Sequence, residues 1–326
     1  MGAGTWTVCD AFTGGASNHR RSIHLPAFLA PAIGSGMFSG RVEKVGVIGL
    51  GIVGSRVAEN LRKAQKHVYV WSRTPKPEPN FMGSPAEIAA NADAVQIFVT
   101  NGEALIQVIE AMEPNLNRGH LILNHATIDV ATTRKAAQIV EAHGASFLDC
   151  PFTGSRMAAE KGQLVYYAGG DAAVLDKARP LLAVTSKHIL HVGGIGDATV
   201  LKITTNMISG ATVQILSEAL AVTEAHGIDG QKLLEALGHN ACCSDLIRMK
   251  LPSILNENYE PHFSLKNMFK DAQIALALAN AKKIETPALS TTASVMFKTL
   301  QQGHGEEDYS VLAANYRKTG EADHAS

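Results

Sequence analysis

Residues 45–55, VGVIGLGIVGS, constrain the fold more than any other stretch of the sequence. The first four are apolar and mostly β-branched, which predicts a short buried strand. The glycines that follow have the G-x-G-x-x-G spacing, and a helical pattern runs over about 52–65. Because these glycines lack side chains, the backbone of the turn can approach the pyrophosphate of a dinucleotide closely. The N-terminus of the following helix attracts the negative charge of that pyrophosphate. We therefore predict a dinucleotide site made by Gly49, Leu50, Gly51, Ile52, Val53 and Gly54.

A glycine-rich turn without a ligand is the alternative interpretation. The strand before the glycines and the helix after them count against it, because the motif carries weight only in that context.

The length, net charge and composition of the chain exclude several classes of protein. The chain has 326 residues, a length typical of about two domains, and a formal net charge of -1, so no basic field gathers nucleic acid. The four cysteines show no C-x-x-C spacing, which fits a reducing compartment. No apolar run is long enough to span a bilayer, and His188 and His191 have no third metal ligand nearby in sequence. We expect a cytoplasmic protein without membrane, nucleic-acid or metal partners.

Residues 1–40 differ from the rest. They are rich in Gly, Ala and Ser, contain the single acidic residue Asp10, and carry Arg20 and Arg21. This composition is compatible with an organelle import segment, and a tail that takes no part in the fold is the alternative. We leave it out of the fold prediction.

Strand and helix patterns alternate between residues 67 and 148. Such alternation predicts a parallel, doubly wound sheet. A long helix from about 197 to 226 comes next, and only helical patterns follow it. The predicted fold class is α/β, an N-terminal Rossmann domain joined by this interdomain helix to an all-α C-terminal domain. The predicted divisions are a tail over 1–40, a cofactor domain over 41–196 and a helical substrate or oligomerisation domain over 197–326.

The residues after the second predicted strand favour NADP over NAD. An NAD site commonly has an acidic residue here for the ribose hydroxyl, and none is present. Arg73 offers a charged planar fork to a 2′-phosphate, with Ser72 and Thr74 beside it. A solvent-facing arginine is the alternative. Because of three prolines within 75–79, the helix that usually follows the second strand is expected to be missing or cut short. Asn101 lies in a turn that would line the ligand crevice.

Four sequence blocks together resemble the β-hydroxyacid dehydrogenase family. They are GLGIVG at 49–54, DCPFTGS at 149–155, GIGDATVLKITTN at 194–206, and Lys270-Asp271. That family includes 3-hydroxyisobutyrate dehydrogenases, and its cofactor domain is of the 6-phosphogluconate dehydrogenase type. The run GSRMAAEKGQL at 154–164 looks closest to the glyoxylate/succinic semialdehyde reductase branch, which tends to use NADPH.

The resemblance implies roles for individual residues. Lys202 corresponds to the catalytic lysine and Lys270 to a lysine that meets the cofactor. Ala126 replaces the first hydroxyl of a usual pair, while Thr127 retains the second. The implied substrate-binding residues are Thr127, Thr153, Gly154 and Ser155.

Lys202 also has a chemical argument of its own. The helix predicted around it is apolar nearly all round, which indicates burial, and Asn206 lies four residues on, on the same face. Burial lowers the pKa of a lysine toward values useful for proton transfer. We predict that Lys202 donates a proton to a carbonyl oxygen as hydride reaches the carbon, with Asn206 positioning the lysine or the substrate. A snorkelling surface lysine is the alternative.

The roles of two further residues stay undecided between alternatives. His125 follows a predicted strand, where it is an acid or base or else a satisfied loop residue. Arg156 binds a second anionic group of the substrate or is a surface charge.

The sequence predicts an NADP(H)-dependent reductase of a small carbonyl acid of the glyoxylate or succinic semialdehyde type. The alternative reaction is oxidation of a 3-hydroxyisobutyrate-type acid. From another class comes a non-catalytic nucleotide-binding scaffold, since some relatives that have lost the lysine serve chromatin. We expect a homodimer or homotetramer whose partner molecule is a small carboxylate-bearing aldehyde or hydroxy acid.

Overall fold

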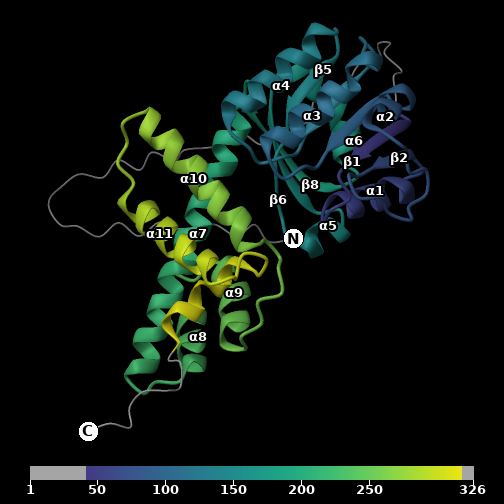
Figure 1. Cartoon of the computed structure of the whole chain (residues 1–326). Coiled ribbons are helices and arrows are strands. Elements are labelled where there is room, and N and C mark those ends of the chain that lie inside the picture. The colour runs from purple at the N-terminus through teal and green to yellow at the C-terminus, as the bar shows by residue number, and fades with distance from the viewer. Residues whose placement is uncertain (1–41, 318–326) are drawn as a thin grey trace, which may run out of the picture. The chain divides into compact units, whose positions relative to one another are not determined.

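The computed structural model describes residues 42–317. A sheet occupies the first part and helices the second (Figure 1). The predicted tail and its import alternative lie outside the described residues. The strands are β1 (Lys44–Ile48), β2 (His67–Trp71), β3 (Ala94–Ile97), β4 (Leu121–Asn124), β5 (Ser146–Asp149), β6 (Phe152–Thr153), β7 (Leu164–Gly169) and β8 (Ser186–Gly193).

The eight strands form one sheet in the order β2-β1-β3-β4-β5-β7-β6, with β8 beside β7. The first five are parallel, as predicted. The strands after residue 149 lie beyond that prediction, and they add antiparallel pairs, because β7 runs antiparallel to both β5 and β6. The connection between β6 and β7 contains only the five-residue helix α5, whereas a parallel crossover needs a dozen residues or more.

Helices cover both faces of the sheet. Val45 and Val47 of β1 pack into one apolar cluster, while Ile48 packs into the other, as the alternation of side chains along a strand requires. The predicted Rossmann fold is therefore confirmed in its doubly wound form. The helices of this part are α1 (Gly54–Lys63), α2 (Pro85–Asn91), α3 (Gly102–Met112), the 3₁₀ turn η1 (Glu113–Asn115), α4 (Val130–Ala142), α5 (Arg156–Glu160) and α6 (Ala172–Leu182).

The proline-rich segment after β2 stays non-helical, as its prolines predict. Order resumes at α2, where Ser84 Oγ accepts a hydrogen bond from the Glu87 backbone N–H at 3.2 Å. The segment is held along β2 by a bridge between Val70 and Phe81. The connection from β2 to β3 thus keeps a helix, the seven-residue α2, which begins only after the prolines.

The regular elements of the second part, among its described residues, are all helices. The 29-residue α7 (Asp197–Ala225) is about 44 Å long. It is followed by α8 (Gly230–Gly238), α9 (Asp245–Leu255), α10 (Leu265–Ala281), α11 (Pro287–Gln301) and the 3₁₀ helix η2 (Tyr309–Tyr316). Our division of the chain at residue 196 stays a prediction. Across residues 42–317, none of the helices has the length and apolar character needed to cross a membrane.

The prediction that α7 is buried on all sides is wrong. Its Lys202 face packs against α10, but Ile208 and Ile215 on another face are 64% and 60% exposed. The other helices of the described chain cover only part of its circumference.

Candidate functional site

The glycine turn after β1 has the geometry that its spacing predicts. Gly49 has a φ of +95°, and a Cβ built there would lie 2.1 Å from the Phe98 carbonyl oxygen. A Cβ on Gly54 would lie 1.9 Å from the Gly49 carbonyl oxygen. Both positions therefore exclude any side chain, and they set the close approach of α1 to β1.

Gly51 is different, because packing within the chain does not explain it. A Cβ at Gly51 would meet no atom within 4 Å. The first turn of α1 next to it has no acidic residue, and Val53 at its N-cap offers no side-chain hydrogen bond. An open glycine beside uncapped helix N–H groups fits a pyrophosphate, whose charge those groups favour.

The chain after β2 presents cations near this turn. Arg73 is exposed and makes no hydrogen bond or ion pair to any residue within 42–317, while the Ser72 hydroxyl donates to the Thr74 carbonyl at 2.7 Å. Lys76 Nζ donates to the Leu50 carbonyl at 2.5 Å. The sequence reasoning missed Lys76, although a second cation three residues after Arg73 was a readable signal.

Four residues from α7 and α10 form one chain of two hydrogen bonds and an ion pair. Lys202 is 9% exposed, and its Nζ donates to Asn206 Oδ1 at 2.8 Å. Asn206 Nδ2 donates to Asp271 Oδ2 at 2.7 Å, and Asp271 Oδ1 lies 2.8 Å from Lys270 Nζ. Lys270 Nζ also donates to the Thr127 carbonyl oxygen after β4. The structure thus brings Lys202, Asn206, Lys270 and Thr127 together, and it adds Asp271, which the sequence identified only as the neighbour of Lys270.

The surroundings of Lys202 suit proton transfer. Burial lowers the pKa of Lys202 to about 8, the negative charge of Asp271 raises it, and the positive charge of Lys270 lowers it further. An amine with this pKa is readily both protonated and deprotonated near neutral pH. Lys202 can therefore act as an acid in one direction of a reaction and as a base in the other.

Asp149 fixes the start of the helix that carries Lys202. This fully buried carboxylate, at the end of β5, accepts hydrogen bonds from the Gly196 and Thr199 backbone N–H groups at 3.2 and 2.9 Å. The Thr199 hydroxyl donates to it at 2.9 Å. Burial raises the pKa of Asp149 to about 6, and these hydrogen bonds oppose that shift. The sheet thereby sets the position of Lys202, one turn along α7.

The predicted substrate loop lies on β6 and at the start of α5. Thr153 belongs to β6, Gly154 has a φ of +139°, and the Ser155 hydroxyl accepts from the Ala158 N–H at 3.4 Å. Among residues 42–317, no hydrogen bond or ion pair joins this loop to Lys202. Asn101, predicted to contact the cofactor, uses its Oδ1 to cap α3 through the Ala104 N–H at 2.8 Å.

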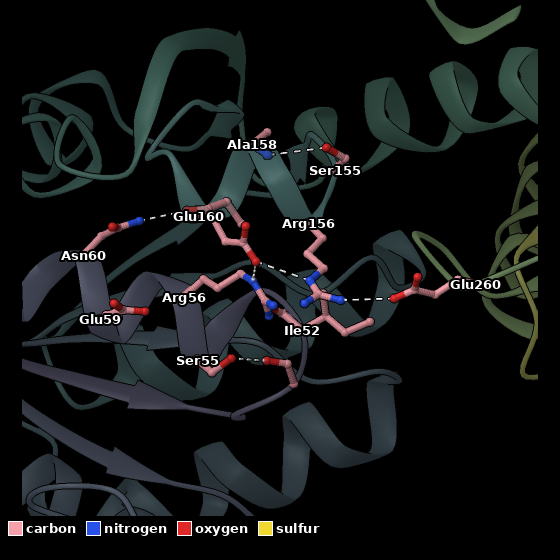
Figure 2. Close-up of polar contacts among 12 residues, drawn as sticks. Ile52, Ser55, Arg56, Glu59, Asn60, Ser155, Arg156, Ala158, Glu160 and Glu260 are labelled. Carbon is pink, nitrogen blue, oxygen red and sulfur yellow. Dashed lines mark hydrogen bonds and ion pairs between the residues drawn. The ribbon is translucent and has the colours of Figure 1, made fainter. Parts of the chain in front are cut away.

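Arg156 lies in a chain of ion pairs (Figure 2). Its Nε contacts Glu160 Oε1 at 3.2 Å, and its Nη1 contacts Glu260 Oε1 at 3.2 Å. Arg56 shares Glu160 Oε1 at 2.8 Å and donates to the Ile52 carbonyl oxygen at 2.6 Å. Two carboxylates thus already occupy Arg156, which disfavours its role as a substrate receptor. The chain joins the glycine turn to α5 and to the α9–α10 connection.

His125 is a structural residue. It is 2% exposed, and its Nδ1 and Nε2 lie 2.6 Å from the Cys150 carbonyl oxygen and 3.0 Å from Gln96 Oε1. Burial lowers the pKa of His125 to about 4, so the ring is neutral and only one nitrogen carries a proton. Rotating the Gln96 amide by 180° pairs its otherwise unpartnered Nε2 with the other ring nitrogen. The loop interpretation is therefore favoured over catalysis.

Two family models match the chain in succession. The NAD binding domain of 6-phosphogluconate dehydrogenase matches residues 44–194. The NAD-binding domain of NADP-dependent 3-hydroxyisobutyrate dehydrogenase matches residues 196–316. Both descriptions name a nicotinamide dinucleotide, which confirms the predicted class of cofactor.

Individual proteins resemble the chain over most of its length. Glyoxylate/succinic semialdehyde reductase 2, chloroplastic, of Arabidopsis thaliana is 30% identical over 279 residues, covering 82% of this chain and 78% of the relative. Cytokine-like nuclear factor N-PAC of Mus musculus is 27% identical and matches 84% of this chain, which spans only 51% of that protein. The solved structure of Mycobacterium tuberculosis 3-hydroxyisobutyrate dehydrogenase shares the fold, with a TM-score of 0.77, 24% identity, and coverage of 85% of this chain and 100% of that one.

Proposed function

This chain belongs to the β-hydroxyacid dehydrogenase family, and from that premise we propose that it reduces a small carbonyl acid, of the glyoxylate or succinic semialdehyde type, with NADPH. The observation that carries the proposal is the buried chain from Lys202 through Asn206 to Asp271. A buried amine held by an amide and a carboxylate is suited to donating a proton at a defined place.

The residues of the chain supply binding, orientation and the proton. A nicotinamide cofactor held at the glycine turn supplies the hydride when it is bound. Protonated Lys202 Nζ donates a proton to the substrate carbonyl oxygen as negative charge develops on it. Asn206 Oδ1 holds one Nζ hydrogen, and Asp271 fixes the orientation of the Asn206 amide. In the oxidative direction the neutral amine of Lys202 accepts the alcohol proton.

The substrate carboxylate is assigned to the loop over Thr153, Gly154 and Ser155, and Thr127 is assigned to the same site. Backbone N–H groups and hydroxyls of this kind bind anions without adding charge. Lys270, which reaches Thr127, is assigned to the cofactor side of the same site.

Turnover of a substrate panel tests the proposed function. The full chain is mixed with NADPH or NADH and with short aldehydes and keto acids, and oxidation of the cofactor is followed at 340 nm. The expected result is turnover with a carboxylate-bearing aldehyde and little with the matching aldehyde that lacks a carboxylate. The reverse assay with hydroxy acids, including 3-hydroxyisobutyrate, tests the alternative reaction. Binding of cofactor without turnover in either assay contradicts the proposal and favours the scaffold function, to which the likeness to N-PAC points.

Replacing Arg73 with alanine tests the preference for NADP. Loss of a charge-assisted hydrogen bond to the 2′-phosphate is expected to weaken NADPH binding about 10- to 100-fold and to leave NADH binding unchanged. Fluorescence titration of both cofactors measures this. Arg179→Ala on α6 is the matched control, because Arg179 is an exposed arginine paired only with a neighbouring residue, Asp176. The preference for NADP is contradicted if the unchanged protein binds NADPH and NADH equally well and the Arg73→Ala variant does the same.

The place of the protein in the cell, cytoplasm or organelle, stays a prediction that depends on residues 1–40. The first of the reported relatives is named as a chloroplastic protein, and we propose a cytoplasmic location with import as the alternative.

A further inference from the structure

The short helix α5 is firmly fixed at its C-terminal end. There the Ala159 carbonyl oxygen accepts a hydrogen bond from Asn60 Nδ2 at 2.8 Å, and Glu160 Oε1 contacts Arg56 Nε at 2.8 Å. Both partners lie on α1, and Ala159 is fully buried in an apolar cluster to which α1 also contributes. This end of α5 is therefore held to the helix that follows the glycine turn.

The other end of α5 directly follows the predicted substrate loop, Thr153 to Ser155. The loop contains Gly154 with a φ of +139°, a conformation that favours glycine, and Met157 just after it is 60% exposed. Within residues 42–317, one polar contact joins the loop or α5 to residues 197–317, the ion pair between Arg156 Nη1 and Glu260 Oε1 at 3.2 Å. We call this ion pair the latch (Figure 2).

Glu260 belongs to a connection between α9 and α10 that is anchored on both sides of it. The Glu260 N–H donates to Asn258 Oδ1 at 3.1 Å. The N–H groups of His262 and Phe263 donate to Asp308 Oδ2 at 3.1 Å, and Asp308 is only 2% exposed. The carboxylate of Glu260 is thus presented from a fixed position shortly before α10 begins.

The latch links the two sides of the proposed site. The proposed proton donor Lys202 and its partner Asp271 lie on α7 and α10, whereas the proposed receptor of the substrate carboxylate is the loop before α5. Across the described chain, no hydrogen bond or ion pair joins that loop to Lys202. The latch is therefore the contact that sets how closely the loop approaches the helices that hold the proton donor.

The latch is weak enough to open and close. The side chains of Arg156 and Glu260 are 47% and 67% exposed, so water and salt screen their charges. Exposed ion pairs typically shift an equilibrium by about two- to five-fold. Arg56, in the ion pair that fixes the other end of α5, is only 19% exposed. The contact that breaks most readily is therefore the one to Glu260.

We propose that the latch closes the substrate loop against the helical part and opens to admit substrate and release product, while α5 keeps its attachment to α1. Arg156 and Glu260 are then positioning residues that act through the loop, and Arg156 does not bind a second anionic group of the substrate. The identity of the ligand in the loop rests on the proposed function. The opening itself is a property of this chain and is measurable without a substrate.

Hydrogen exchange of the full chain, followed by mass spectrometry, tests the latch without turnover. Glu260→Gln removes the charge and keeps the shape of the side chain. The Ala158 and Ala159 amides, which donate to Ser155, are then expected to exchange about two- to five-fold faster. Salt at about 1 M is expected to remove this difference, because it screens the ion pair in the unchanged protein.

Glu235→Gln is the matched control for the exchange experiment. Glu235 is an exposed glutamate of the helical part that pairs with Lys232 within α8. Its replacement is expected to leave the exchange of α5 unchanged. Exchange in Glu260→Gln that equals exchange in the unchanged protein overturns the latch.

Arg156→Gln tests whether the two charges act through each other. The double variant Arg156→Gln, Glu260→Gln is expected to exchange no faster at α5 than Arg156→Gln alone, because the second substitution removes a partner already lost. A double variant whose effect is the product of the two single effects overturns the pairing.

Steady-state kinetics separate the latch from direct binding of the substrate by Arg156. The latch predicts that Glu260→Gln raises KM for a carboxylate-bearing aldehyde about two- to five-fold and keeps the pH dependence set by Lys202. An Arg156 that binds the substrate predicts a lower KM, because removal of the Glu260 charge frees the guanidinium. A lower KM therefore overturns the latch. Faster exchange of α5 in a protein without turnover supports the latch and overturns only the proposed function.

Discussion

Replacing Lys202 with methionine is expected to lower kcat for carbonyl reduction by about 10²- to 10⁴-fold, the usual contribution of a positioned proton donor. Methionine preserves the length of the side chain and fills the buried space, but it cannot donate a proton. Cofactor binding is expected to persist, because the glycine turn lies on a different element. Steady-state kinetics with the best substrate of the panel and titration of NADPH measure the two effects separately.

The pH dependence of the unchanged protein provides a second signature of Lys202. Reduction needs the protonated amine, so its rate is expected to fall as pH rises through about 8, and oxidation needs the neutral amine, so its rate is expected to rise over the same range. Lys232→Met is the control, since Lys232 is an exposed lysine paired with Glu235 on α8. If Lys202→Met keeps both its rate and this pH dependence, another group donates the proton.

Replacing Asp271 with asparagine is expected to shift the pH dependence of reduction toward lower pH. The carboxylate raises the pKa of Lys202, so its removal lets burial and the neighbouring Lys270 lower that pKa further. For each unit by which the pKa of Lys202 falls, the ratio of its ammonium form to its amine form falls about tenfold at a given pH. The rate of reduction above neutral pH therefore falls, while the maximal rate at lower pH is reduced less. A full pH–rate profile of the variant measures both.

Asp171→Asn is the matched control for this substitution. Asp171 caps α6 by accepting from the Ala173 N–H at 2.7 Å, so its replacement changes the same functional group away from Lys202. It is expected to leave the pH dependence in place even if it lowers stability. A pH profile of Asp271→Asn that coincides with that of the unchanged protein contradicts the role assigned to the carboxylate.

Relations within one element could be predicted from residue spacing. The close approach of Gly54 to Gly49 and the cap at Ser84 depend on neighbours a few residues away. The hydrogen bond between Lys202 and Asn206 follows from their separation by one helical turn. Each of these was predictable because helix and strand geometry converts a short interval in sequence into a position in space.

Relations between distant elements could not be predicted in this way. Asp149 lies 50 residues before Thr199, and Asn206 lies 65 residues before Asp271. Their contacts depend on how β5, α7 and α10 pack, which no local interval encodes. Arg156 illustrates the same point, because its ion pair with Glu260 joins residues that are 104 positions apart in the sequence.

The sequence by itself determined that a dinucleotide turn precedes a long lysine-bearing helix, because glycine spacing and helical periodicity act over a few residues. Only the tertiary structure decided which carboxylates hold that helix and its lysine, that β7 pairs antiparallel with β5 and β6, and that Ile208 and Ile215 of α7 are exposed. Those outcomes depend on the packing of whole elements, where burial and long-range hydrogen bonds select one arrangement among the many that local preferences allow.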